Sequence, residues 1–392
     1  MNTAFQTLLL CGLVFGQIVS ADEPASAPVA KDSWPLFRGN PSMTGVRTAG
    51  ADSDLRLPLE LVWTFQAEGK RVGCKSSAII ADGRVFIGDD NGVFHCLSLK
   101  DGTEIWKVET GDTFEGTACF AGDDLVVVGV GTGFVHAFER KTGKEVWKFE
   151  TMGEVLGSMN VHRDPKDGTE RIIFGSYDNF CYCLDAKTGE KLWEFETGNY
   201  INGAVAIDQG QAMFGGCDGF IYRVDVITGE AKGEIEVGNH IASTIAVDSG
   251  VAYTGHYGNR VSAFNLEDGA EIWEYGEREF PYFSSPLVLP EHIIIGGRDK
   301  RVHCIDRVTG KGIWEYRARD QIDSSPVLVN GVIYLGCDDG VIYGLGVKDG
   351  EELWTYELGE AIKSSPAVAE NRLVISTDDG AVHCFRTEPA GE

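Results

Sequence analysis

The chain has 392 residues, of which 50 are glycine, and its 34 basic and 60 acidic residues give a formal net charge of −26 at pH 7. A surface this acidic repels nucleic-acid backbones and anionic lipid headgroups, so neither is expected as a partner. The glycine content, with 43% hydrophobic residues, fits many short strands joined by tight turns.

The N-terminal segment has the pattern of a secretory signal peptide. An apolar run from Phe5 to Val19 is followed by small residues, and we expect cleavage after Ala21. Leu10 occupies the place where a lipoprotein signal needs a small residue before Cys11, so no lipid anchor is expected there. No later segment is apolar over the length needed to cross a bilayer. We predict a signal peptide at 1–21 and a periplasmic or secreted mature protein.

Two segments precede the main domain. Residues 22–33 are rich in Pro, Ala and Ser and are predicted to form a flexible linker. Residues 34–58 form a lead-in, and its sequence WPLFRGNPSMTGV at 34–46 contains aromatic and turn residues. We expect these residues to dock on the body of the domain, which covers 59–392.

The domain repeats one pattern. In six places a glycine stands four residues before a tryptophan, a degenerate copy has Gly233 in the tryptophan position, and a half-copy begins the series. The copies are 40 to 46 residues apart, which is typical of a β-propeller with four short strands in each blade. We interpret the repeated indoles as wedges between blades. They are Trp63, Trp106, Trp147, Trp193, Trp273, Trp314 and Trp354.

The order of strands predicts how the ring closes. Pro286, Pro326 and Pro366 fall in the first strand of their repeats, and proline is tolerated only at a sheet edge, so this strand should be innermost. Eight copies of strands one to three are present, but only seven are followed by a fourth strand. The unmatched strand is ELVWTFQ at the front. We therefore predict an all-β, eight-bladed propeller in which residues 59–66 pair beside 381–386.

The cysteines and histidines are predicted to be structural. Nine cysteines remain after signal cleavage, an odd number that argues against a disulfide framework. Equivalent positions in different blades lie ~12 Å apart, too far to form a disulfide or share a metal ion. No metal site is therefore expected, and His256 and Tyr257 are expected on an exposed loop. The equivalent residues are Cys96, Cys183, Cys304 and Cys384, and His95, His136, His303 and His383.

The repeat, with its small residue, Asp, Thr-Gly and Trp, resembles that of the pyrroloquinoline-quinone (PQQ) type propellers over residues 59–386. Within that family the chain resembles most the short secreted BamB-type members. The quinoprotein alcohol dehydrogenases are similar in repeat only, because this sequence has no Cys-Cys pair, no C-x-x-C-H motif and no tryptophan left to stack on a quinone. The resemblance therefore implies a scaffold that holds no cofactor, in preference to an enzyme that uses PQQ and calcium.

If the chain binds a ligand, the site should be the channel mouth, where only innermost strands converge. Two interpretations remain open: ion pairs that close the mouth, or a polar pocket that includes Asn202, Tyr282 and Phe283. Glu115, Asn202 and Asp323 are residue types that hold calcium and quinone in the dehydrogenases, without a match of positions. The residue ahead of each first strand gives the ring Lys75, Glu115, Leu156, Asn202, Ala242, Phe283, Asp323 and Lys363.

The favoured function is an exported, non-catalytic propeller that binds a protein partner or an extracellular polymer. We expect it to be a monomer. The alternative is a PQQ- and calcium-dependent oxidoreductase, or a small-ligand-binding propeller, that uses the channel mouth.

Overall fold

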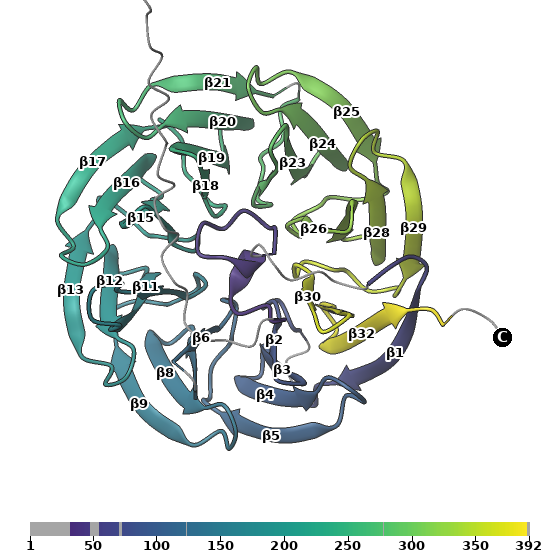
Figure 1. Ribbon diagram of the computed structural model, residues 1–392, viewed down its shortest axis with the longest axis horizontal. Coiled ribbons are helices and arrows are strands. Elements are labelled where there is room, and N and C mark those ends of the chain that lie inside the picture. The colour runs from purple at the N-terminus through teal and green to yellow at the C-terminus, as the bar shows by residue number, and fades with distance from the viewer. Residues whose placement is uncertain (1–31, 48–54, 70–72, 123, 277, 390–392) are drawn as a thin grey trace, which may run out of the picture.

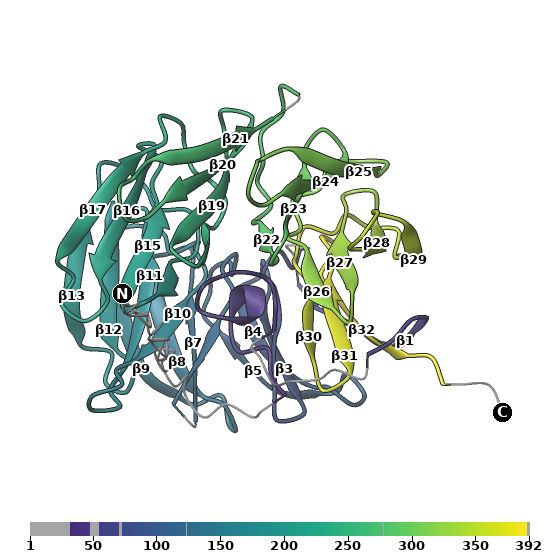
Figure 2. The same ribbon diagram turned by 45° about the horizontal axis from the view of Figure 1, so that its top comes forward.

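The computed structural model describes residues 32–47, 55–69, 73–122, 124–276 and 278–389. The predicted signal peptide and nearly all of the predicted linker lie outside these residues. Eight four-stranded sheets stand side by side in a ring (Figure 1), and Figure 2 shows the ring tilted by 45°. The predicted eight-bladed β-propeller is confirmed. The described helical element is the single 3-10 turn η1 (Phe37–Gly39).

The first four blades are each built from four consecutive antiparallel strands. Their bounds are β2 (Ile79–Ala81), β3 (Arg84–Gly88), β4 (Val93–Ser98) and β5 (Glu104–Glu109) in blade 1; β6 (Cys119–Ala121), β7 (Leu125–Gly129), β8 (Phe134–Glu139) and β9 (Glu145–Glu150) in blade 2; β10 (Asn160–Arg163), β11 (Glu170–Gly175), β12 (Phe180–Asp185) and β13 (Lys191–Glu196) in blade 3; and β14 (Ala206–Asp208), β15 (Gln211–Gly215), β16 (Phe220–Asp225) and β17 (Ala231–Glu236) in blade 4.

Blades 5 to 7 follow the same order, and blade 8 takes its outer strand from the front of the chain. The bounds are β18 (Ala246–Asp248), β19 (Val251–His256), β20 (Arg260–Asn265) and β21 (Glu271–Tyr275) in blade 5; β22 (Leu287–Val288), β23 (His292–Gly297), β24 (Arg301–Asp306) and β25 (Gly312–Arg317) in blade 6; β26 (Val327–Val329), β27 (Val332–Gly336), β28 (Val341–Gly346) and β29 (Glu352–Glu357) in blade 7; and β30 (Ala367–Ala369), β31 (Arg372–Ser376), β32 (Ala381–Thr387) and β1 (Leu59–Gln66) in blade 8.

The first strand of each blade lines the channel, and neighbouring inner strands such as β2 and β30 lie beside each other. The three prolines that indicated this arrangement stand just before β22, β26 and β30 rather than inside them. Ring closure also follows the prediction, since β1 pairs with β32 from Leu59↔Thr387 to Gln66↔Ala381.

The repeated glycine and tryptophan fit each other across every regular joint between blades. Gly189 has φ +73°, and a Cβ there would lie 2.7 Å from the ring of Trp147 in the preceding blade. Glycine is thus required both by the turn and by the close approach of the indole. The Trp147 Nε1–H donates to the backbone oxygen of Ala186 at 2.9 Å. Each indole of this kind wedges one blade against the next.

Residues 34–46 lie across the centre of the ring (Figure 1). Their backbone oxygens accept hydrogen bonds from inner-strand residues of seven blades, and Asp32 accepts one from the eighth. Residues 32–46 together therefore contact the inner side of every blade. The bonds are Ile80 N to Trp34 O, Phe120 N to Pro35 O, Asn160 Nδ2 to Pro41 O, Ile207 N to Pro41 O, Val247 N to Ser42 O, Val288 N to Thr44 O, Leu328 N to Gly45 O and Glu370 N to Asp32 Oδ1.

Arg38 anchors this segment at the channel axis. Only 1% of Arg38 is exposed, and its Nη1 and Nη2 atoms donate to the backbone oxygens of Pro326 at 2.6 Å and Pro286 at 2.9 Å. Burial lowers the pKa of Arg38 to about 9. A Cβ at Gly45 would lie 2.2 Å from Arg38 Nη2, so the guanidinium occupies space that only glycine leaves open.

The nine cysteines of the described residues are all free, and eight of them are buried. Burial raises the pKa of Cys96, Cys304 and Cys384 to about 12, so these thiols are not reactive nucleophiles at neutral pH. No helix in the described part of the chain has the length and apolar character needed to span a membrane.

Candidate functional site

Two sets of equivalent residues, one residue per blade in each, meet at the mouth of the channel. The first is the predicted set, which precedes the inner strands. The second follows the second strand of each blade, and it consists of Asp90, Gly131, Tyr177, Cys217, Tyr257, Arg298, Asp338 and Asp378. Six contacts join the two sets, namely Lys75–Asp90, Asn202–Tyr177, Asn202–Cys217, Phe283–Tyr257, Asp323–Arg298 and Lys363–Asp378.

Charged residues gather on one half of the mouth, over blades 6, 7, 8, 1 and 2. Lys75 Nζ lies 3.8 Å from Asp90 and 3.5 Å from Glu115. Lys363 forms an ion pair with Asp378, and this hydrogen bond raises the pKa of Lys363. Within the predicted set only Lys75 and Glu115 pair with each other, whereas Lys363 pairs with a residue of the second set.

The ion pairs leave part of this acidic half without partners. The Oδ1 atoms of Asp90, Asp338 and Asp378 are buried, and none accepts a hydrogen bond from the described residues. Burial raises the pKa of Asp90 and of Asp338. These three carboxylates come from adjacent blades and contribute to the negative charge of this half.

Aromatic rings gather on the other half, over blades 3 to 6. Tyr177 and Tyr200 stack with ring centroids 4.9 Å apart. Tyr257 packs edge-on against Phe283 at 5.0 Å, and the guanidinium of Arg298 lies over Phe283 at 3.6 Å from its centroid. Tyr200 and Tyr257 are 47% and 49% exposed. These rings present an apolar surface beside the acidic half.

Of the remaining residues predicted for the mouth, two lie there and one does not. Asn202 lies at the mouth, where its Oδ1 accepts a hydrogen bond from the Tyr177 hydroxyl and its Nδ2 donates one to Cys217 Sγ. Asp323 accepts two hydrogen bonds from Arg298, at 2.9 and 2.8 Å. Tyr282 does not line the mouth, because it is only 3% exposed and packs edge-on against His303.

A ring of hydroxyl groups surrounds the channel below the mouth. In seven of the eight positions the backbone amide of one blade donates to a Ser or Thr hydroxyl of the next. The series is interrupted once, where Ala204 offers no hydroxyl to the amide of Ser158. The bonds are Ser77 to Thr117, Thr117 to Ser158, Ala204 to Thr244, Thr244 to Ser285, Ser285 to Ser325, Ser325 to Ser365 and Ser365 to Ser77.

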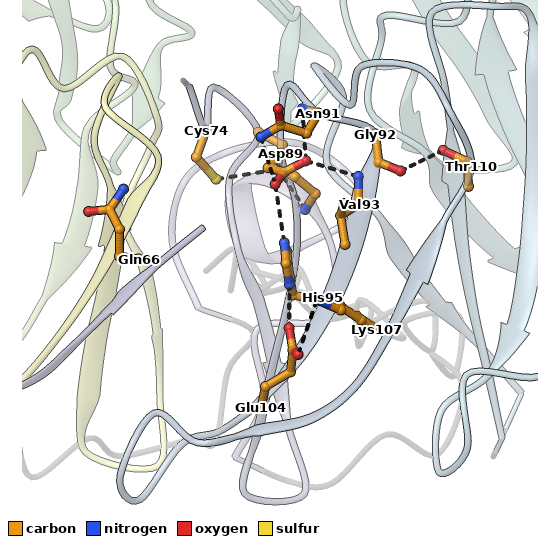
Figure 3. A network of polar contacts seen from close by, with 12 residues as sticks. Gln66, Cys74, Asp89, Asn91, Gly92, Val93, His95, Glu104, Lys107 and Thr110 are labelled. Atoms are coloured by element: carbon orange, nitrogen blue, oxygen red, sulfur yellow. Dashed lines mark hydrogen bonds and ion pairs between the residues drawn. The ribbon is translucent and has the colours of Figure 1, made fainter. Parts of the chain in front are cut away.

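The repeated histidines lie inside the blades, away from one another. His95 lies between Asp89 and Glu104, with its Nε2 3.3 Å from the first and its Nδ1 2.8 Å from the second (Figure 3). Burial raises the pKa of Asp89, but hydrogen bonds, including that from His95, outweigh it and the net pKa is lowered. No group of three or more His, Cys, Asp or Glu side chains in the described part of the chain has an arrangement that could hold a metal ion.

The expectation of an exposed loop at His256 and Tyr257 was wrong for the first residue. His256 is 3% exposed, because it ends strand β19 and its Nε2 lies 3.3 Å from Ser262 Oγ inside the blade. Tyr257 is exposed as expected.

Sequence reasoning missed the second mouth set and the hydroxyl ring. The second set could have been found by aligning the residue two places after the repeated glycine or serine at or near the end of each second strand. The hydroxyl ring was present in the repeated Ser-Ser pairs, but which group each hydroxyl bonds depends on the spacing between blades.

Comparison with known proteins agrees with this architecture. A family model described as "Outer membrane protein assembly factor BamB" matches residues 60–176, 96–278 and 258–388. No curated protein matches the sequence significantly.

Solved structures of the same fold include BamB from Moraxella catarrhalis, with 20% identity, a TM-score of 0.68 and coverage of 86% of this chain and 99% of that one. The quinohemoprotein alcohol dehydrogenase of Comamonas testosteroni is also similar, with 14% identity, a TM-score of 0.77 and coverage of 92% and 82%. A europium-containing methanol dehydrogenase has 12% identity, a TM-score of 0.72 and coverage of 91% and 98%. At these identities the structures show a shared fold.

The match of the family model to nearly the whole propeller shows more than a shared fold, because it covers the repeat from β1 to β32. This chain therefore belongs to the PQQ-like β-propeller repeat family described by outer membrane protein assembly factor BamB.

Proposed function

We propose that the chain is an exported, non-catalytic β-propeller that binds a protein partner at the channel mouth. The observation that carries this proposal is the division of the mouth into an acidic half with unpaired carboxylate oxygens and a half of exposed aromatic rings. Aromatic side chains provide much of the binding energy at protein interfaces, and the net negative charge of the acidic half favours a basic group on the partner. A segment with a basic side chain next to an apolar one would complement both halves.

Family membership supports a role outside the cytoplasm. The family is described by an outer-membrane assembly factor, and a periplasmic or secreted location agrees with the predicted signal peptide at 1–21. We infer that the protein presents its mouth to a partner in that compartment.

The alternative, a PQQ- and calcium-dependent oxidoreductase, has poorer support from the residues present. The three oxygen-bearing candidates already have partners: Glu115 is paired with Lys75, Asn202 with Tyr177, and Asp323 with Arg298. They belong to blades 2, 4 and 7 rather than to one donor cluster. These residues do not fit a shared calcium and quinone site, so no catalytic step is assigned to them.

Site-specific photo-crosslinking in the native host tests the proposal. A benzoylphenylalanine at Tyr257, on the mouth face, should capture a discrete protein. The same probe at Val308, which is 77% exposed on a turn at the opposite end of the blades, is the matched control. Equal capture from both positions, or none from Tyr257, would count against a mouth partner, and glycan binding lost in Tyr257→Ala would favour an extracellular polymer.

Calorimetric titration with PQQ and calcium, together with dye reduction in the presence of alcohols, tests the alternative. We expect neither saturable heat nor turnover. Turnover that is lost in Glu115→Gln would replace the scaffold proposal with the enzyme.

A further inference from the structure

The joint between blades 4 and 5 departs from the six regular joints of the ring. At six joints a tryptophan Nε1–H donates to a backbone oxygen of the next blade, at 2.9 to 3.2 Å. In blade 4 the tryptophan position is Gly233, and Arg223, which is paired with Gly233 across the sheet, donates from Nη1 to the equivalent oxygen of Leu266. The arginine side chain therefore replaces the hydrogen bond that the indole makes at the other joints, but it does not fill the space of the indole ring.

Two more positions at the same joint have lost their large or charged side chains. Ser262 stands where the third strand of every other blade has His or Tyr. Gly258 stands where five blades have an aspartate, and in blades 3, 4 and 7 that aspartate accepts a hydrogen bond from the tyrosine. A cavity of about 260 Å³ lies at this joint, and its lining includes Gly258 and Ser262.

The walls of this cavity carry an excess of negative charge. Glu236, Glu271 and Glu274 line it, with Arg260 as the lining cation. Arg260 Nε donates to Glu274 at 2.8 Å, whereas Glu236 and Glu271 have no ion-pair partner among the described residues. His256 adds no positive charge at neutral pH, because burial lowers its pKa. Phe264 supplies an apolar surface at the same cavity.

We propose that this cavity is a second binding site, separate from the mouth, for an organic cation of the guanidinium or primary-amine class. Two unpaired carboxylates provide acceptors, and the phenyl ring of Phe264 suits the flat face or the alkyl stem of such a group. The cavity exists because the repeat is broken at Gly233, Gly258 and Ser262 together. Any one of these changes alone would remove only one of the side chains that fill the regular joints.

Calorimetric titration at low ionic strength tests the proposal with N-acetyl-arginine amide, N-acetyl-lysine amide and the neutral, isosteric N-acetyl-citrulline amide. The two cations should bind saturably and the citrulline derivative should not. The cation could come from a protein side chain or from a small molecule, and a peptide with a central arginine distinguishes the two. If the peptide binds with the same affinity as N-acetyl-arginine amide, the site takes a protein side chain. If the peptide does not bind, the site takes a small molecule.

Variants locate the binding. Ser262→Tyr introduces the residue that blades 3, 4 and 7 have at this position, so it should fill the cavity and abolish binding while the melting temperature is kept or raised. Glu236→Gln should weaken binding about threefold to tenfold. The control Glu196→Gln removes the equivalent charge from blade 3 and should leave binding unchanged.

The proposal would be overturned by any of three results: equal affinity for the citrulline derivative, no saturable binding of either cation, or binding that is retained in a folded Ser262→Tyr variant. None of these results depends on the mouth, so the proposed scaffold function stands or falls separately.

Discussion

Completing the hydroxyl ring below the mouth should stabilise the propeller. The ring has seven amide-to-hydroxyl bonds of 2.9 to 3.3 Å, and it is open only between Ser158 and Ala204. Ala204 is 3% exposed, and its exchange for serine adds one oxygen at the position where the other blades hold the hydroxyl. We expect Ala204→Ser to supply the missing acceptor to the amide of Ser158.

The magnitude follows from what one such bond contributes. A hydrogen bond in a folded protein contributes about 1 kcal/mol net, and a buried group left without its partner costs about 1–3 kcal/mol. Ala204→Ser should therefore raise the free energy of unfolding by about 1 kcal/mol. The reverse change, Ser365→Ala, removes the acceptor of the Ser325 amide and should lower it by a comparable or larger amount.

Urea denaturation of the three proteins measures both changes, because the midpoint shifts while the slope stays constant when only stability changes. The reasoning would be refuted if Ser365→Ala lost stability as expected but Ala204→Ser left the midpoint unchanged or lowered it. That result would mean that the open position is not equivalent to the other seven. If neither variant shifted the midpoint, the ring would contribute nothing to stability.

Three further changes test other parts of the ring. Trp193→Ala removes a wedge that is 8% exposed and should cost ~3–5 kcal/mol in urea unfolding; a loss below ~1 kcal/mol would contradict the wedge role. Arg38→Met keeps the volume but removes both bonds to the Pro286 and Pro326 oxygens, so residues 34–46 should become sensitive to limited proteolysis; continued protection would show that Arg38 does not anchor them. Burial lowers the pKa of His383 to about 4, so its contribution is complete above its unfolded pKa of ~6.5 and is lost as the pH falls toward 4. The urea midpoint should therefore drop less between pH 7 and pH 5 in His383→Phe, and equal drops would exclude His383 as a cause.

The architecture could be predicted because the sequence repeats with a regular period. Each Gly-to-Trp spacing fixes one turn and one wedge, and the unmatched strand around Trp63 was enough to predict its pairing with β32. The mouth residues ahead of the inner strands followed from the same alignment. Their side-chain directions did not, because Tyr282 and Phe283 are adjacent in sequence and one is buried while the other lies at the mouth.

The features that could not be predicted depend on distances between blades. The exchange of a tryptophan for Gly233 was visible as a degenerate copy, but the compensating hydrogen bond from Arg223 to Leu266 requires the position of blade 5. In the same way, the turn residues of 34–46 suggested docking, whereas the contact of residues 32–46 with every blade depends on the diameter of the channel.

The segment at 32–46 bears on the order of folding. It is synthesised before any blade, yet the hydrogen-bond partners that it finds in the blades are all made later, the last of them being Glu370. It cannot complete its contacts until the whole ring has assembled. Repeat arrays normally gain stability from neighbour to neighbour, but a single stretch bonded to all eight repeats links their unfolding. We expect this propeller to lose its structure in one concerted transition instead of blade by blade.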